Sequence, residues 1–299
     1  MSRRLKVSSA QLGPINLADS RGSKFVVFPE LALTTFFPRY WTEDQAEVDK
    51  YFENQMPSPE TAPLFELARS KGIGFYLGYA ERTEEEGATH RFNTSILVGP
   101  DGRLIGKYRK VHLPGHDDHR PNVPYQHLEK KYFEVGDLGF NVWKMFKDEV
   151  IVGQCICNDR RWPETFRVMG LKGAEMVVLG YNTPIDNVYA PHEPPYLRVF
   201  HHNLSLQAAA YQNGIWVVAT AKAGKEDGYW LHGGSVIVAP TGEIVAKGTT
   251  EEDEVISYDC DLALGEYIRN TTFNFARHRR PEHYKLISER AGVKLEPSN

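Results

Sequence analysis

The sequence predicts a layered domain built from β-sheets and helices, of the α/β or α+β class. Short β-rich runs recur along the chain, and several are apolar without alternation, which is typical of strands covered on both faces. Amphipathic helical patterns lie between these runs. Because the 299 residues contain no low-complexity linker and no fixed-period repeat, we expect a single domain over residues 1–299.

Polar or turn residues close each expected strand. Two hairpin-like turns, PDG at 100–102 and PTG at 240–242, lie between β-rich stretches. In chain order the expected strands are 5–10, 24–28, 75–80, 94–98, 150–156, 176–180, 215–220, 234–238 and 255–258.

Three segments have the pattern of helices. Residues 62–71 (APLFELARSK) are amphipathic and end at Gly72, which suits the left-handed residue after a helix. Residues 163–171 begin with proline at an N1-like position. Residues 200–213 are rich in alanine, leucine and glutamine. Strands that alternate with helices and hairpins are expected to stack in layers.

The connection between the first two strands is unusually short. The first strand ends near Gln11 and the second begins at Lys24, with one proline, two glycines and about one turn of helix between them. A parallel crossover usually needs a dozen or more residues, including a helix. Either the two strands are not parallel neighbours, or a segment is absent from the sequence.

Composition and charge exclude several classes of function. The chain is 41% hydrophobic and 25% charged, and its formal net charge of −4 gives no general attraction to nucleic acid or anionic membranes. No apolar run is long enough to cross a bilayer, and no apolar signal segment follows the basic start MSRRLK. Three cysteines are too few for a disulfide framework. We therefore expect a soluble, reduced, cytoplasmic protein.

A carboxylate follows the second apolar strand. In FVVFPE, Pro29 cannot donate a ladder hydrogen bond and so marks the end of the strand, directly before Glu30. Partial burial there would raise the pKa of the carboxyl group and suit it to general-base catalysis. The alternatives are a helix N-cap and a surface salt bridge.

A cluster of cations precedes an apolar segment in GKYRKVHLPG. Three cations within four residues usually form a solvated face. Lys110, however, is followed by Val-His-Leu-Pro, where the chain enters apolar surroundings again. A buried lysine can stabilise an oxyanion, which makes Lys110 a candidate for catalysis.

Cys157 lies between an apolar strand and a helix that begins at Pro163, in CICNDRRWPE. A thiol at such an elbow gains from helix N-terminal amides, which stabilise the thiolate, and from an adjacent backbone N–H for an oxyanion. The alternative is a small buried hydrophobe, which we expect for Cys155. The CxC spacing is wrong for a zinc finger and no second ligand pair follows, so we expect no metal.

Glu30, Lys110 and Cys157, in the contexts FPE, GKYRKVHLPG and CICNDRRWPE, resemble the nitrilase superfamily of carbon–nitrogen hydrolases. Within it, the chain resembles the N-carbamoyl-D-amino-acid amidohydrolases (D-carbamoylases) over essentially its whole length. That resemblance rests on VVFPELALTTFFPR, RFNTSILV, YQHLEKKYFEVGDLGF, CNDRRWPETFRVMGLKGAE, GYNTP and APTGEIVA. The chain departs from the family around Ser20 and Arg21, where the usual helix between the first two strands is missing.

The resemblance implies an α+β fold, a four-layer αββα sandwich with the catalytic triad at strand ends. It implies hydrolysis of N-carbamoyl-D-amino acids to the D-amino acid, carbon dioxide and ammonia, with Glu30 as general base, Lys110 as oxyanion stabiliser and Cys157 as nucleophile. The thiolate would attack the ureido carbonyl, with the oxyanion between Lys110 and the Asn158 amide. Ammonia leaves, and water activated by Glu30 cleaves the thioester. No metal or organic cofactor is required.

Further residues match the family site. Glu129, in HLEK, matches a second acid there and is expected to orient Lys110; an ordinary surface Glu–Lys pair is the alternative. His112 and His127 match histidines that line the pocket, although each alone would fit a structural histidine. The resemblance therefore implies that Glu129, His112 and His127 lie in one pocket with Lys110.

The substrate carboxylate has its own candidate residues. Arg160 and Arg161 offer guanidinium forks that can bind a free α-carboxylate. Asn182 and Thr183 match residues that help to hold it. Because adjacent arginines usually face different ways, we expect one to bind substrate and the other to support the site.

The sequence leaves three other functions open. Another superfamily activity, that of a β-ureidopropionase-like enzyme, an aliphatic amidase or a nitrilase, is less favoured because nitriles and simple amides carry no carboxylate for CNDRRW and YNTP. A silent scaffold is disfavoured by the intact triad. Nucleic-acid binding through RHRR at 277–280 is disfavoured by the acidic chain, so this run reads as an interface or anchor. The segment FNFARHRRPEHYKLI resembles one that crosses a dimer interface, which implies a homo-oligomer, a dimer of dimers, with about 265–299 as its interface extension.

Overall fold

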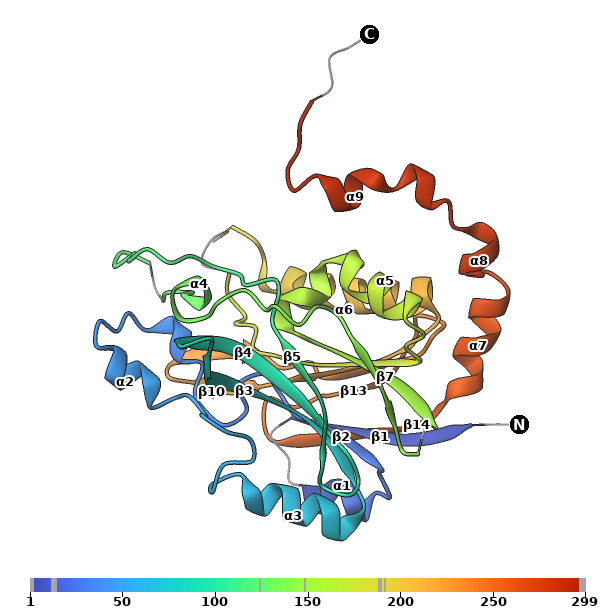
Figure 1. Ribbon diagram of the computed structural model, residues 1–299, viewed down its shortest axis with the longest axis horizontal. Helices are drawn as coiled ribbons and strands as arrows, with labels where there is room; N and C mark the ends of the chain where they lie inside the picture. Colours follow the sequence, from blue (N-terminus) through green and yellow to red (C-terminus); the bar gives the residue numbers. More distant parts are fainter. Residues whose placement is uncertain are drawn as a thin grey trace.

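The computed structural model describes residues 3–11, 15–123, 125–147, 149–187, 190 and 192–295. Two six-stranded sheets stack face to face, and helices cover their outer faces (Figure 1). The first sheet has the order β14-β1-β2-β3-β4-β5, and the second has the order β13-β12-β9-β8-β7-β6. The predicted four-layer αββα sandwich is therefore confirmed.

The first sheet is mixed. The pairs β1–β2 and β2–β3 are parallel, and the remaining pairs are antiparallel. Its strands are β1 (Arg4–Gln11), β2 (Phe25–Val27), β3 (Gly74–Glu85), β4 (Ala88–Val98), β5 (Leu104–Arg109) and β14 (Glu254–Asp261).

The second sheet has the parallel pairs β7–β8 and β8–β9 at its centre and antiparallel strands outside them. Its strands are β6 (Val142–Met145), β7 (Val150–Ile156), β8 (Met176–Tyr181), β9 (Trp216–Ala221), β12 (Val236–Val238) and β13 (Ile244–Lys247). A separate two-stranded ribbon is formed by β10 (Ala223–Glu226) and β11 (Tyr229–His232).

Apolar side chains join the four layers. Between the sheets, Val7 and Val27 of the first sheet pack with Val178 and Val218 of the second. Each such side chain, once buried, stabilises the fold by about 1.5–3 kcal/mol. This is why the central strands are apolar on both faces and show no polar alternation.

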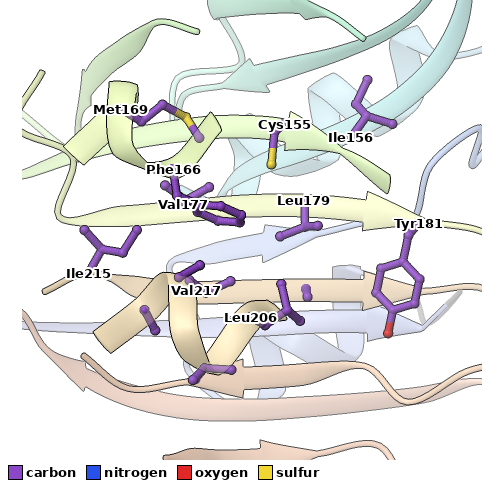
Figure 2. Close-up of a cluster of buried hydrophobic side chains, with 14 of the residues drawn as sticks. Cys155, Ile156, Phe166, Met169, Val177, Leu179, Tyr181, Leu206, Ile215 and Val217 are labelled. Carbon is purple, nitrogen blue, oxygen red and sulfur yellow. The ribbon is translucent and has the colours of Figure 1, made fainter. Parts of the chain in front are cut away.

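Helices close both outer faces. On the first sheet lie α1 (Ile15–Ser20) and α3 (Ala62–Lys71), the latter through Phe65 and Ala68. On the second sheet lie α5 (Pro163–Leu171) and α6 (Pro195–Asn213), whose Phe166 and Leu206 pack with strands β8 and β9 (Figure 2). The bounds predicted for α3 and α5 are confirmed, whereas α6 begins five residues before the expected start at 200.

The remaining short helices lie in loops or near the C-terminus. Figure 1 shows the chain leaving the edge of the sandwich through α7 and α8 and turning back above α5 at α9. They are α2 (Gln45–Asp49), α4 (Glu129–Tyr132), α7 (Leu262–Asn270), α8 (Phe275–His278) and α9 (Lys285–Glu289), with 3₁₀ turns η1 (Phe37–Arg39), η2 (Cys157–Arg161) and η3 (Pro281–His283).

The short connection after β1 corrects two expectations. Strands β1 and β2 are parallel neighbours, with Val7 opposite Phe25, so the proposal that they are not neighbours is wrong. The helix thought to be missing near Ser20 is present as the six-residue α1, although residues 12–14 lie outside the described part of the chain. The six residues of α1 span about 9 Å along the helix axis. The three residues of β2 span about 10 Å, so the short helix is long enough to return the chain to the start of that strand.

Candidate active site

Glu30 lies just beyond the end of β2, completely buried between the two sheets. Its Oε1 accepts hydrogen bonds from Lys110 Nζ at 2.7 Å and Asn93 Nδ2 at 2.8 Å. Its Oε2 accepts one from the backbone N–H of Asn182 at 3.0 Å. The alternatives of an N-cap and a surface salt bridge are therefore wrong.

Two glycines make room for the segment that carries Glu30. A Cβ atom on Gly180 of β8 would lie 2.3 Å from the Glu30 nitrogen, and one on Gly78 of β3 would lie 2.9 Å from the Glu30 Cα. Leu31, the next residue, has a left-handed φ of 46°. Backbone packing from both sheets thus fixes the position of the carboxylate.

Lys110 follows β5 and is also completely buried. Its ammonium group donates to Glu30 at 2.7 Å and to Glu129 Oε2 at 2.5 Å. Burial alone would lower the pKa of Lys110, but its electrostatic interactions with Cys157 and with the carboxylates of Glu129 and Glu30 outweigh burial and raise it. The lysine therefore carries its positive charge between two carboxylates.

The neighbouring cations do not form the solvated face that their clustering suggests. Arg109 is buried, pairs with Glu81 at 2.9 Å and places its guanidinium carbon 4.0 Å from the centroid of the Phe92 ring. Because its partners come from β3 and β4, the sequence around Arg109 gives no sign of them.

Glu129 begins α4 and lies in the interior, so the surface-pair alternative is wrong. Besides Lys110, it contacts His127, whose Nε2 is 3.2 Å from Glu129 Oε1. Burial would raise the pKa of Glu129, but the charges of Lys110 and His127 outweigh it and lower the pKa. His127 is only partly buried. It lies in the loop before α4 and is linked to Lys110 through Glu129.

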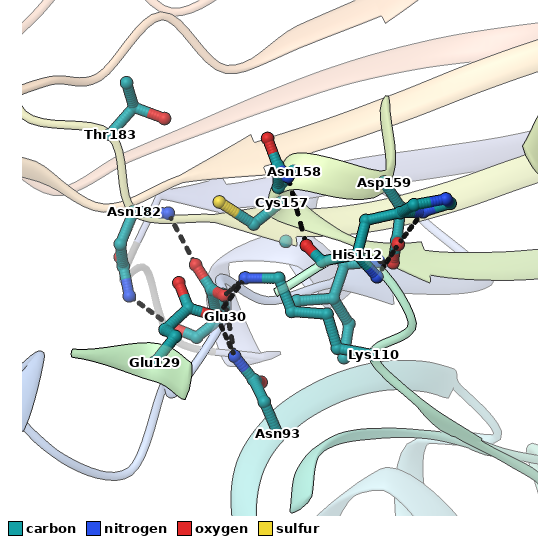
Figure 3. Close-up of polar contacts among 12 residues, drawn as sticks. Glu30, Asn93, Lys110, His112, Glu129, Cys157, Asn158, Asp159, Asn182 and Thr183 are labelled. Carbon is teal, nitrogen blue, oxygen red and sulfur yellow. Dashed lines mark hydrogen bonds and ion pairs between the residues drawn. The ribbon is translucent and has the colours of Figure 1, made fainter. Parts of the chain in front are cut away.

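Cys157 opens the 3₁₀ turn η2 with a left-handed φ of 46°, so the chain turns sharply at the thiol. Figure 3 shows its side chain beside Glu30, Lys110 and Glu129. Burial and the Glu30 charge raise the pKa of Cys157, against the opposing charges of Lys110 and Arg160. The expected thiolate stabilised by helix amides is therefore wrong for this state: α5 begins only at Pro163, and burial dominates.

Asp159 holds the elbow and was missed as a functional residue. Its carboxylate accepts from the Tyr108 hydroxyl at 2.8 Å and from the Ile156 N–H at 2.9 Å. It also accepts from the His112 N–H at 3.0 Å and contacts His112 Nδ1 at 2.8 Å. His112 stacks on Trp162, with ring centroids 4.9 Å apart. The only local signal was the aspartate of CND, and its importance depends on partners that are distant in the sequence.

Asn158 uses its side chain to support the turn. Its Nδ2 donates to the His112 carbonyl at 3.1 Å, and its Oδ1 accepts from Arg161 at 3.1 Å. The backbone N–H of Asn158 lies in the first turn of η2, where no earlier residue of that turn can accept from it. Its role as an oxyanion donor remains a prediction.

Arg160 and Arg161 point in different directions, as expected. Arg160 is 2% exposed, and it donates to the Cys157 carbonyl at 2.7 Å and to Thr183 Oγ1 at 2.9 Å. Its guanidinium carbon lies 4.6 Å from the centroid of the Tyr181 ring. Arg161 is exposed and contacts Asn158. Arg160 is thus the arginine adjacent to the thiol.

Asn182 and Thr183 follow β8 and are both buried. Asn182 holds Glu30, because its side-chain amide donates to the Glu30 carbonyl at 2.9 Å and its backbone N–H to the carboxylate. Thr183 accepts from Arg160. The structure therefore brings all eleven predicted site residues around Glu30, Cys157 or their direct partners.

A small cavity adjoins the site, between the β10–β11 ribbon and the loop before η1. Arg39, the last residue of η1, pairs with Glu226 of the ribbon at 2.8 Å. The cavity is mainly aromatic and apolar, and its lining includes Phe36, Tyr125, Pro184, Tyr229 and Leu231 together with His127 and Asn182. It therefore connects the catalytic residues to apolar walls.

Within the described residues, no three His, Cys, Asp or Glu side chains are grouped so that they could hold a metal ion. Cys155, Cys157 and Cys260 are free thiols. Cys155 is a buried member of the core beneath α5, as expected. Among the described residues, the helices are too short or too polar to span a membrane.

Comparison with known proteins agrees with this architecture. The sequence matches the carbon-nitrogen hydrolase family over residues 7–270. It is 31% identical to a nitrilase of Pyrococcus abyssi over 274 residues, which cover 90% of this chain and 89% of the relative. It is 30% identical to an N-carbamoylputrescine amidase of Arabidopsis thaliana over 278 residues, which cover 90% and 86%.

A solved structure shows the same fold. The carbon-nitrogen hydrolase from Helicobacter pylori G27 superposes with a TM-score of 0.79 at 23% identity, covering 96% of this chain and 99% of that one. Fold and sequence together define a hydrolase of the nitrilase superfamily. The chain belongs to the carbon-nitrogen hydrolase family, whose members act on carbon–nitrogen bonds other than peptide bonds.

Proposed function

We propose that this enzyme hydrolyses N-carbamoyl-D-amino acids to the D-amino acid, carbon dioxide and ammonia. Glu30 acts as general base, Lys110 and the Asn158 amide bind the oxyanion, and Cys157 is the nucleophile, while Glu129 holds Lys110 in place. The preference for a D-amino acid follows from the resemblance of CNDRRWPE and GYNTP to the D-carbamoylases. No metal or organic cofactor takes part in this chemistry.

The substrate assignment depends mainly on the buried, unneutralised guanidinium group of Arg160. Its buried guanidinium bridges Cys157 and Thr183 and forms no ion pair with a carboxylate among the described residues. A buried guanidinium needs a counter-charge, and a planar carboxylate fits its fork. An N-carbamoyl-amino acid supplies that carboxylate close to its ureido carbon, whereas a simple amide or nitrile does not.

The proposed reaction has two halves. First, Glu30 takes the thiol proton as Cys157 sulfur bonds to the ureido carbon; Glu30 then returns this proton to the terminal nitrogen, and ammonia leaves. Second, Glu30 takes a proton from water as the water oxygen bonds to the thioester carbon. The carbon–sulfur bond then breaks, and Glu30 returns the proton to the Cys157 sulfur. The released N-carboxy-amino acid loses carbon dioxide to give the amino acid.

The relatives support hydrolysis of a carbon–nitrogen bond but leave several substrate classes to be distinguished by experiment. The N-carbamoylputrescine amidase is named for a substrate with the same N-carbamoyl group, whereas the nitrilase is named for nitriles. We therefore compare N-carbamoyl-D-phenylalanine with its L-enantiomer, an aliphatic amide and a nitrile. Phenylalanine suits the aromatic walls of the cavity.

Ammonia release from the D-enantiomer alone is the expected result, and the measurement is a coupled ammonia assay run with all four compounds. Turnover of the L-enantiomer at an equal rate would contradict the stereochemical assignment. Turnover of the amide or nitrile in preference to both enantiomers would assign the enzyme elsewhere in the superfamily. A folded protein inactive on every compound would favour the silent scaffold.

We also propose that the enzyme is a homo-oligomer, built as a dimer of dimers. A large groove lies between α5 and the C-terminal segment, and Leu171 of α5 and Ile287 of α9 line it. Both side chains are exposed, as is Leu286 beside them. Light scattering is expected to give a mass above that of one chain and a smaller mass for Leu171→Glu. A monomer at micromolar concentration would contradict the proposal.

A further inference from the structure

Unpartnered polar atoms gather around the ring of Tyr181, behind the thiol. The ring of His202 lies 4.5 Å from the Tyr181 ring, the ring of His232 lies 5.5 Å away, and the guanidinium carbon of Arg160 lies 4.6 Å away. Among the described residues, Arg160 Nε, His202 Nδ1 and both ring nitrogens of His232 are buried without a hydrogen-bond partner. Such atoms are rare in native proteins, and an ordered water, an ion or a ligand can supply the missing partner.

The β10–β11 ribbon fixes the position of His232. The His232 backbone N–H donates to the Thr183 carbonyl at 3.0 Å, and the Thr183 hydroxyl accepts from Arg160 at 2.9 Å. The ribbon therefore attaches His232 directly to the residue that orients Arg160. His202 differs, because its Nε2 already contacts the Tyr181 hydroxyl at 3.0 Å.

Three guanidinium groups dominate the charge around His232. Arg160, Arg161 and Arg198 form no ion pair with a carboxylate in the described part of the chain. The charge of Arg160 is the main cause of a lowered pKa for Arg161, whereas burial is the main cause for Arg198, to which the charge of Arg160 adds. Glu193 acts on both from nearby but contacts His201, at 3.3 Å. This surplus of positive charge favours an anion.

His232 is neutral in this surrounding. Burial and then the charges of Arg160 and Arg198 lower the pKa of His232 to about 3. A neutral imidazole has one N–H donor and one acceptor, and neither has a partner here. An N–H donor beside unneutralised guanidinium groups suits a carboxylate oxygen, which accepts from both.

We propose that His232 donates a hydrogen bond to the substrate carboxylate bound by Arg160, so that His232 is a binding residue that selects acids over their amides. The inference rests on the proposed function and adds a specificity residue to it. The hairpin that carries His232 also contributes Tyr229 and Leu231 to the cavity wall. One ribbon then contacts both the carboxylate and the side chain of the substrate.

The test measures binding without turnover. The proteins are Cys157→Ala and the double variants that add His232→Leu, His232→Gln or Trp230→Leu. Trp230, on the same strand, is 47% exposed and serves as the matched control. Calorimetry gives the Kd of N-carbamoyl-D-phenylalanine and of its carboxamide for each protein, and thermal unfolding shows that each is folded.

We expect His232→Leu to weaken binding of the acid about 10- to 100-fold, because a hydrogen bond to a charged group is lost, and to leave binding of the carboxamide unchanged. His232→Gln keeps a donor and is expected to bind the acid more tightly than His232→Leu, and Trp230→Leu to match Cys157→Ala. Equal weakening of acid and carboxamide, or no change in either, would overturn the inference alone. If Cys157→Ala binds neither compound, both the inference and the proposed function fail.

Discussion

Cys157→Ala is expected to lower kcat by on the order of 10⁵-fold or more without unfolding the protein, because the Cys157 sulfur is the atom that attacks the ureido carbon and carries the covalent intermediate. Cys157→Ser is expected to be nearly as inactive, because Glu30 cannot deprotonate a hydroxyl as readily as a thiol. The measurement is steady-state ammonia release from N-carbamoyl-D-phenylalanine, with near-UV circular dichroism as the check on folding.

Cys155→Ala is the matched control for this variant. Cys155 lies two residues earlier, near the end of β7, and is buried in the core with Phe166 and Leu179. Its removal is expected to lower stability slightly through a small cavity, by about 1 kcal/mol, and to change kcat only a few-fold. Equal loss of activity in both variants would show that the strand, and not the Cys157 thiol, was responsible.

Lys110→Met is expected both to abolish turnover and to lower the free energy of unfolding by about 3–5 kcal/mol, since it leaves the buried carboxylates of Glu30 and Glu129 without their shared cation. The measurement is equilibrium unfolding in urea beside the ammonia assay. Lys50→Met, which removes an exposed lysine paired with Glu47, is expected to behave as wild type in both assays.

A second variant separates the two effects of Lys110. Glu129→Gln added to Lys110→Met removes one of the two buried charges, so we expect the double variant to regain part of the lost stability. Turnover should stay absent, because the oxyanion still lacks its cation. Recovery of activity in the double variant would contradict the assignment of Lys110 as the oxyanion stabiliser.

The elements of the sandwich were predicted most accurately where the sequence contains both the periodic pattern of an element and a residue that marks its end. The helix 62–71 has an amphipathic face and a terminal glycine, and the structure ends α3 at Lys71 with Gly72 left-handed. The start of α6 at Pro195 was missed, because the proline pair at 194–195 reads as a loop. Strand β5 was missed because its two cations suggest a solvated segment, whereas Arg109 is buried and paired with Glu81 of β3, two strands away in the sheet.

The site could be predicted to the extent that it follows strand ends. Glu30 and Cys157 follow apolar strands, and the resemblance connected them with Lys110. Asp159 and His232 could not be found this way, because their roles depend on contacts with residues of other elements. Asp159 contacts Tyr108, and His232 contacts Thr183. The prediction of a stabilised thiolate at Cys157 was also wrong. Its pKa is raised by burial and by Glu30, and the degree of burial depends on how the two sheets pack.

The most direct test of the account is to identify the covalent intermediate. N-carbamoyl-D-phenylalanine labelled at the ureido carbon is mixed with wild-type enzyme and quenched in acid during turnover, and the digested protein is mapped by mass spectrometry. The account predicts the label on Cys157, with the mass of the substrate less ammonia. Label on another residue, or unlabelled Cys157 in an enzyme whose Cys157→Ala variant still turns over, would contradict it.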